Sequence, residues 1–171
     1  MGNRNTNRYL DLGDGVTHLV LQDGTTYVID TTDRPLIEGY TWRRSGKKYM
    51  YACTNVKKGN RLGTLKLHRI LCQTTAERPF VDHESGDVLD NRRSNLRPCT
   101  RAENNANKGR YKNNKTTVKG VFFHKSRQKF EAWVGVGGKQ LYVGCYTDPS
   151  DAEQDIRAFR ERQHGEFARH A

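Results

Sequence analysis

The stretch FVDHESGDVLDNRRSNLRPCTRAENNANK, residues 80–108, decides the fold of this chain. Residues 80–83 have the composition of a short strand, a polar loop rich in turn residues follows, and residues 96–99 return as extended chain. Thr100-Arg101-Ala102-Glu103 then matches a capping box, which starts a helix whose opening turns contain Asn104. The order of strand, loop, strand and capped helix predicts a ββα unit.

The sequence before this unit predicts a β-rich lead-in. Short alternating segments bounded by turn residues indicate strands at residues 16–21, 25–29, 49–56 and 62–67. A short apolar segment at residues 67–72 predicts a helix, and the first ten residues, rich in Asn and Arg, predict a loose arm. We expect this lead-in and the ββα unit to form one domain, residues 1–108.

The sequence after the ββα unit predicts a second domain at residues 118–171, joined by a basic linker at residues 109–117. Three strands are expected at residues 118–123, 130–136 and 140–146. Asp148 and Pro149 open a final helix, on which Ala152, Ile156 and Phe159 form one apolar stripe. The expected fold class is therefore α+β, ending in a three-stranded antiparallel sheet packed on one helix.

The charge of the chain indicates a polyanionic partner. Its 171 residues carry a formal net charge of +11. Between Arg101 and Trp133 there are nine Lys or Arg residues and only two acids, Glu103 and Glu131. A basic run is often just a solvated face, but this uneven placement favours a nucleic-acid footprint.

The cysteines and the hydropathy exclude other classes of protein. The four cysteines (Cys53, Cys72, Cys99 and Cys145) contain no Cys-x-x-Cys pair, which disfavours a structural zinc site or a redox motif. No apolar stretch is long enough for a signal peptide or a membrane span. We expect reduced thiols, a cytoplasmic location and no membrane partner.

The dipeptide Asp82-His83 carries the chemistry that the sequence suggests. Phosphodiester cleavage needs a base that activates water and a cation that neutralises charge on the phosphate. Asp82 offers an oxygen ligand beside the imidazole, although strand alternation points the two side chains apart unless the strand is distorted. Asn104 offers a second oxygen, and such ligands suit one Mg²⁺ or Mn²⁺ ion. Taken alone, an Asp-His pair is usually a surface acid beside an ordinary histidine.

The pattern around this pair resembles a nuclease family. The segments Leu67-His68-Arg69-Ile70-Leu71, Val81-Asp82-His83-Glu84-Ser85-Gly86-Asp87 and Leu89-Asp90-Asn91-Arg92-Arg93-Ser94-Asn95-Leu96-Arg97 are similar to those of the HNH endonucleases often encoded by bacteriophages, which are ββα-metal nucleases. The spacing agrees, because Asn95 lies 12 residues after His83 and Asn104 lies 9 residues after Asn95.

The resemblance implies a role for each of these residues. His83 would be the general base, Asp82 and Asn104 would bind the single divalent metal, and Asn95 would orient His83 by bonding to backbone across the loop. Many HNH nucleases have His where this chain has Asn104, so metal preference is open, and Asn105 is the alternative ligand if the helix is rotated. Candidate DNA contacts are His68, Arg69, Arg92 and Arg93. His68 alternatively packs against the ββα unit, and the arginines alternatively remain solvated.

The C-terminal region resembles the Apetala/ethylene-response-factor DNA-binding domain. The likeness rests on Lys119-Gly120-Val121, Lys129-Phe130-Glu131-Ala132-Trp133, Leu141-Tyr142-Val143-Gly144 and Gly165-Glu166-Phe167-Ala168. It implies a sheet that enters the major groove of DNA. Phe130, Ala132 and Val134 would face the helix. The residues expected to face DNA are Lys119, His124, Arg127, Lys129, Glu131, Trp133 and Tyr142.

Two features of that region stay open at this stage. Phe122 and Phe123 stand where the plant pattern has Arg, so the resemblance carries no sequence preference over to this chain. Trp133 and Tyr142 have core packing as their alternative reading.

The sequence as a whole predicts a metal-dependent endonuclease that hydrolyses phosphodiester bonds of double-stranded DNA, of the homing type, without a small-molecule cofactor. We expect a monomer, which would nick one strand and leave a 5′-phosphate and a 3′-hydroxyl. The alternatives are a non-catalytic, sequence-specific DNA-binding protein and a nucleic-acid protein associated with packaging.

Overall fold

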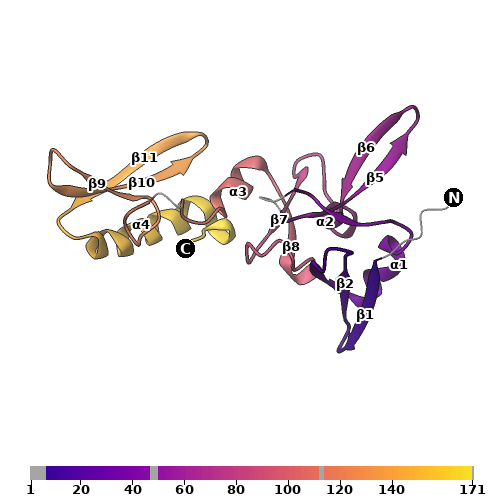
Figure 1. Cartoon of the computed structure of the whole chain (residues 1–171). Coiled ribbons are helices and arrows are strands. Elements are labelled where there is room, and N and C mark those ends of the chain that lie inside the picture. The colour runs from indigo at the N-terminus through magenta and orange to yellow at the C-terminus, as the bar shows by residue number, and fades with distance from the viewer. Residues whose placement is uncertain (1–6, 47–49, 112–113, 171) are drawn as a thin grey trace. The chain divides into compact units, whose positions relative to one another are not determined.

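The computed structural model of the chain describes residues 7–46, 50–111 and 114–170 (Figure 1). Over these ranges the protein is α+β, and its strands form four small antiparallel sheets. The chain divides into two compact units, Met1–Cys99 and Thr100–Ala171. This division lies earlier than the expected boundary at residue 108. No helix in the described ranges is both long and apolar enough to cross a bilayer.

The first unit begins with a three-stranded meander of β1 (Arg8–Gly13), β2 (Val16–Val20) and β3 (Thr26–Asp30). The expected hairpin is confirmed as β2 and β3. The expected loose arm is wrong for residues 8–10, because they begin β1 and pair with β2. This edge strand leaves Leu10 and Leu12 about half exposed, so its sequence shows no buried face.

A second sheet and three short helices complete the β-rich part of this unit. The chain continues through η1 (Thr31–Asp33), α1 (Arg34–Ile37), β4 (Arg43–Arg44), β5 (Ala52–Lys58), β6 (Arg61–Lys66) and α2 (Leu67–Leu71). The strands form the sheet β4-β5-β6. The expected strands at 49–56 and 62–67 correspond to β5 and β6, although β5 begins only at Ala52 and β6 ends at Lys66. α2 confirms the short helix, and residue 49 lies outside the described ranges.

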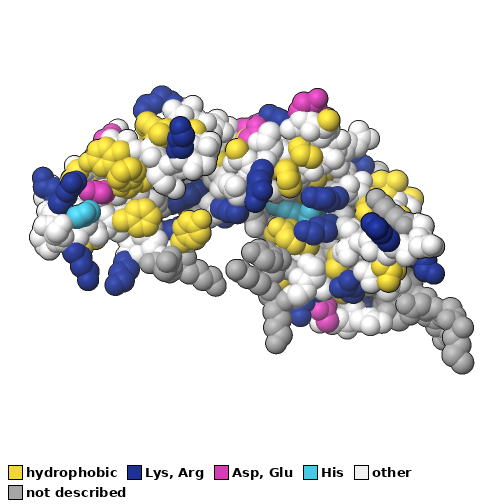
Figure 2. All heavy atoms as spheres, turned by 90° about the horizontal axis from the view of Figure 1, so that it is seen from above, with side chains coloured by type: hydrophobic (Ala, Val, Ile, Leu, Met, Phe, Trp, Pro, Cys, Tyr) yellow, Lys and Arg dark blue, Asp and Glu magenta, His cyan; other side chains and the backbone are white. Residues whose placement is uncertain are grey.

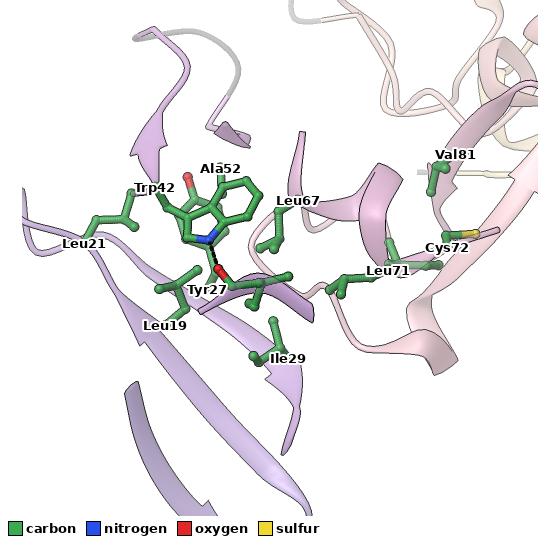
Figure 3. Close-up of a cluster of buried hydrophobic side chains, with 12 residues drawn as sticks. Leu19, Leu21, Tyr27, Ile29, Trp42, Ala52, Leu67, Leu71, Cys72 and Val81 are labelled. Carbon is green, nitrogen blue, oxygen red and sulfur yellow. Dashed lines mark hydrogen bonds between the residues drawn. The ribbon is translucent and has the colours of Figure 1, made fainter. Parts of the chain in front are cut away.

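One apolar core supports the first unit (Figure 3). The indole of Trp42 lies over Leu67 and Ala52, and its Nε1 donates to the carbonyl oxygen of Ile37 at 3.0 Å. Leu71 and Cys72 connect this cluster to Val81 on the next strand. The members of the core are Leu19, Leu21, Tyr27, Ile29, Ile37, Trp42, Ala52, Leu67, Leu71, Cys72, Val81 and Leu96.

The two strands of the expected ββα unit have the predicted bounds. β7 (Phe80–His83) and β8 (Leu96–Cys99) pair antiparallel, with Asp82 opposite Arg97 and His83 opposite Leu96. The loop between them ends in η2 (Arg93–Asn95). This loop also bonds to β3, because the amide of Val28 donates to the Leu89 carbonyl (2.9 Å) and the amide of Asn91 donates to the Val28 carbonyl (2.7 Å).

The second unit contains helix α3 and the C-terminal sheet with its helix. α3 (Arg101–Ala106) begins at the predicted capping box. β9 (Val121–His124), β10 (Lys129–Val136) and β11 (Lys139–Tyr146) form the sheet β11-β10-β9, which packs on α4 (Pro149–His164). η3 (Gly165–Phe167) follows. Asp148 caps α4 as expected, through the amide of Ser150 at 2.8 Å.

β9 starts later than expected because Gly120 makes a turn. Gly120 has φ +79°, and a Cβ on it would lie 2.5 Å from the carbonyl oxygen of Trp133. No other residue fits so close to that backbone with a left-handed conformation. The core behind the sheet consists of Val118, Val121, Ala132, Val134, Ala152 and Ile156.

Candidate active site and nucleic-acid interface

Asp82 is a buried carboxylate on β7, with 6% of its surface exposed. Its partner across the two-stranded sheet is Arg97, whose Nε and Nη2 both lie 3.0 Å from Oδ2. The guanidinium compensates for the burial of this carboxylate through two charge-assisted hydrogen bonds. Glu84 contributes a longer contact, 3.8 Å from Nη1 of Arg97.

His83 follows Asp82 and is equally buried, with 5% exposed. Its Nε2 lies 3.4 Å from Oδ1 of Asn91. The amide nitrogen of Asn91 donates to the carbonyl oxygens of Val88 (3.2 Å) and Leu89 (3.1 Å), so the oxygen is the atom turned to the ring. Because an amide oxygen only accepts, Nε2 carries the proton and Nδ1 is the basic nitrogen of the neutral imidazole.

Burial keeps His83 neutral. Desolvation is the largest cause that lowers the pKa of His83, and it outweighs the hydrogen bond to Asn91 and the nearby carboxylates, which raise the pKa. A neutral imidazole near pH 7 can accept a proton from water, which is the requirement for a general base.

His68 and Tyr51 pack beside His83 as a cluster of rings. The ring centroid of His68 lies 5.2 Å from that of His83 and 5.0 Å from that of Tyr51. Burial lowers the pKa of His68 to about 3, with a smaller contribution from His83. His68 is 5% exposed, which favours the packing role over the predicted DNA contact.

Asn95 fixes the loop after His83. Its Oδ1 accepts from the amide of Ser85 (2.9 Å), and its Nδ2 donates to the carbonyl oxygens of Asp90 (2.7 Å) and Asp87 (3.4 Å). The amide of Glu84 donates to its main-chain oxygen at 2.9 Å. Asn95 therefore bonds to backbone on both sides of the loop and does not touch the imidazole through any of these bonds.

The two arginines of the loop bind carboxylates of the chain. Arg92 reaches Asp90 through Nε (2.9 Å) and Nη2 (2.6 Å). Arg93 reaches the buried Asp33 with Nη2 at 2.7 Å. Both ion pairs hold the loop in place, so the predicted phosphate contacts stay predictions, as does that of the exposed Arg69.

Asn104 lies on α3, in the second unit, and is half-buried, whereas Asn105 is exposed. The Thr100 hydroxyl accepts from the amide of Glu103 (3.2 Å), and the Glu103 carboxylate accepts from the amide of Thr100 (2.7 Å). This double cap fixes the first turn of the helix and thereby the residue that follows it.

The donor chemistry fits magnesium better than zinc. Nowhere in the described ranges do three or more His, Cys, Asp or Glu side chains gather around one point suited to a metal ion. Magnesium is commonly held by one or two protein oxygens, with water and phosphate completing its shell. Asp82 and Asn104 each carry an oxygen donor of that kind, and the Asp82 carboxylate is already bound by Arg97.

The outer face of the C-terminal sheet is aromatic. Ala132 and Val134 point into the core against α4, so Trp133 lies on the opposite face, where its ring is 5.0 Å from that of Tyr142. This placement excludes the core-packing alternative for both side chains. Phe122 lies on the same face, opposite Glu131 in the register.

The remaining predicted DNA contacts differ in accessibility. Lys129 and Arg127 are exposed and His124 is half-buried. Lys119 donates to the carbonyl oxygens of Ala106 (3.0 Å) and Arg169 (2.8 Å), and burial lowers its pKa to about 8. Lys119 therefore joins α3 to the C-terminal residues of its own unit, a role that sequence reasoning missed.

The charges of the second unit are separated between its two layers. Residues 118–146, which form the sheet, contain five Lys or Arg and one acid, whereas residues 148–166, which form the helix, contain three and six. In Figure 2 the C-terminal unit, on the left, exposes a gathering of hydrophobic side chains bordered by Lys and Arg. The sheet layer is the one that attracts a polyanion.

Comparison with protein-family models, with curated proteins and with solved structures gave no match to this chain. The functional assignment depends on the geometry described above and on the sequence resemblances.

Proposed function

We propose that the chain is a metal-dependent DNA endonuclease whose catalytic base lies on β7. The observation that carries the proposal is the buried, neutral His83. Its Nε2–H donates to the amide oxygen of Asn91, so that Nδ1 is the basic atom, and the carboxylate of Asp82 is the preceding residue. A base and an anionic ligand are thus adjacent, as hydrolysis of a phosphodiester requires.

In the proposed mechanism His83 removes a proton from water at Nδ1, and the resulting hydroxide attacks the phosphorus of a DNA phosphodiester. Asp82 would bind the divalent ion, and the family resemblance adds Asn104 as a further ligand; the ion would neutralise charge on the phosphate and on the leaving oxygen. Arg97 holds the Asp82 carboxylate in place through an ion pair. The bond between phosphorus and the 3′ oxygen breaks, and the departing oxygen takes a proton from water, which leaves a 5′-phosphate and a 3′-hydroxyl. One such centre in a monomer cuts one strand, so nicking is the expected reaction.

The second unit supplies the affinity for double-stranded DNA. Its basic sheet layer would attract phosphates, and its outer face would enter the major groove, a mode available to β-sheets. Lys129, Arg127 and Tyr142 are the exposed groups proposed to contact DNA there.

A supercoiled plasmid tests the nuclease. Wild type in Mg²⁺ or Mn²⁺ is expected to convert the plasmid to open circles and to leave it intact in chelator. His83→Ala is expected to lose at least about 100-fold in rate, the contribution of a general base, and to keep its DNA affinity. His18→Ala removes a half-buried histidine of β2 and serves as the matched control, which should cleave like wild type.

One observation favours the alternative, a non-catalytic DNA-binding protein. Oδ2 of Asp82 already receives two contacts from Arg97, as in a structural ion pair. This alternative predicts salt-sensitive DNA binding with no metal-dependent cleavage by wild type. Equal cleavage by wild type and His83→Ala would instead show that the activity has another source.

A further inference from the structure

The outer face of the C-terminal sheet exposes two large aromatic side chains. Phe122 and Tyr142 each expose 49% of their surface, on the outer strands on either side of β10. Trp133 lies between them in the sheet and touches Tyr142. Large apolar side chains seldom stay exposed together without a partner, so this face is suited to contact with another surface.

The polar groups of the same face bind one another. Glu131 accepts from Nη1 of Arg127 at 2.9 Å and from the indole nitrogen of Trp133 at 3.3 Å. Its side chain is only 12% exposed. A guanidinium tied to a carboxylate is a poor reader of guanine, which Arg recognises through two acceptor atoms. The side chains of this face that remain for contact with bases are chiefly the aromatic ones, Phe122 and Tyr142.

The charge of the unit identifies the occupant as DNA. The sheet layer carries five basic residues and one acid, while the acids gather on the opposite layer, α4. Lys129 and Lys125 are exposed at the edge of the face, where they can meet phosphates. In the major groove the one apolar group that a base pair presents is the 5-methyl of thymine.

We propose that this face reads thymine methyl groups in the major groove, with Phe122 and Tyr142 as the contact residues. The proposal rests on the proposed DNA binding of the second unit and does not depend on cleavage. The sequence resemblance predicts no base preference, because Phe122 stands where the plant pattern has Arg. The present proposal supplies one, a preference for thymine.

Replacement of thymidine by deoxyuridine tests the proposal, since the two differ in the 5-methyl group alone. Duplexes are first selected from a random-sequence pool by binding to the whole chain in chelator. The selected duplex is then resynthesised with deoxyuridine at its thymidines. Wild type is expected to bind the deoxyuridine duplex about fourfold more weakly for each methyl group lost from the contact, the value of burying one such group.

Substitutions of Phe122 test whether this side chain causes the weaker binding of the deoxyuridine duplex. Phe122→Ala is expected to bind the two duplexes with affinities closer to each other than in wild type, whereas Phe122→Leu keeps a hydrocarbon contact and keeps the preference. Leu36→Ala removes an apolar side chain of similar exposure (50%) from the first unit and is the matched control.

Equal affinity of wild type for both duplexes would overturn the proposal and leave the nuclease untouched. So would a selected duplex without thymine, or an unchanged preference in a folded Phe122→Ala. Absence of any DNA binding by wild type would overturn the proposed DNA binding itself and the methyl reading with it.

Discussion

Two buried histidines, His68 and His83, lie side by side in the first unit. His68 and His83 pack ring to ring, and both pKa values are lowered chiefly by desolvation. The two imidazole rings differ in the groups that they contact. Nε2 of His83 meets the amide oxygen of Asn91, whereas the ring of His68 packs against the rings of Tyr51 and His83. A general base needs such a fixed orientation, and a packing histidine does not.

The burial of His68 predicts that the first unit loses stability in acid. The pKa of His68 falls from 6.5 to about 3 in the folded chain. Above pH 6.5 His68 is neutral in both the folded and the unfolded chain, so its contribution to the free energy of unfolding is constant. Between pH 6.5 and 3 His68 is protonated only in the unfolded chain. The free energy of unfolding therefore decreases as the pH is lowered through this range, by up to about 1.4 kcal/mol per pH unit from this group.

Fluorescence of Trp42 measures this effect in the first unit. The chain has two tryptophans, and Trp133→Phe removes the one in the second unit. Urea unfolding in this background at pH 7 and pH 5 is compared with the same background carrying His68→Phe. The Phe variant is expected to show the weaker pH dependence. An identical pH dependence in both would contradict a neutral His68 in the folded chain.

At the scale of elements, local signals predicted most of the fold. Alternation and turn residues gave β7 and β8 with their observed bounds, and caps located the starts of α3 and α4. β1 was missed because its pairing with β2 leaves its own leucines exposed. The helices and strands that were predicted correctly are those specified by sequence signals within a few residues of the element.

The candidate site was predictable to the same extent. The family resemblance singled out Asp82, His83 and Asn95, and it included Asn91 only as part of a matching segment. The position of Asn91 depends on a hydrogen bond from its amide to Val28 of β3, 63 residues earlier in the chain. No local pattern predicts such a contact.

The cap of α3 gives a prediction at this scale. Thr100→Ala removes the hydroxyl that accepts from Glu103 and is expected to cost about 1 kcal/mol. Because Asn104 lies in the turn that this cap fixes, the cleavage rate should fall while DNA affinity in chelator is retained.

Asp148→Ala removes the equivalent cap of α4 and is the matched control. It is expected to lower the stability of the second unit by a similar amount and to leave the cleavage rate at saturating DNA unchanged. Full activity of Thr100→Ala would show that the start of α3 does not contribute to the active centre.

At the scale of the whole molecule, the net charge of +11 matters less than its placement. The basic residues of the second unit belong mainly to the sheet layer and the acids to α4. An even distribution would attract DNA to any surface, whereas this one would direct DNA to the proposed binding face, which carries the aromatic side chains.

Charge reversal on the two layers separates placement from total charge. Lys125→Glu and Arg162→Glu change the net charge equally, and both residues are exposed, the first on the sheet layer and the second on α4. Lys125→Glu is expected to weaken DNA binding and to reduce the slope of log K against log salt by about 1. Arg162→Glu should change the slope little. Equal effects would show that net charge alone governs binding.

The hydrogen bonds between the loop and β3 restrict how the proposed nuclease motif can be reused. The segment from β7 to β8 looks like a self-contained cassette, yet Val28, Asp30 and Asp33 hold it through the amide of Asn91, the amide of Arg93 and the Arg93 guanidinium. Transplanted alone into another scaffold, the cassette loses the strand that orients Asn91, and with it the partner of the imidazole. A working graft has to include residues 26–33.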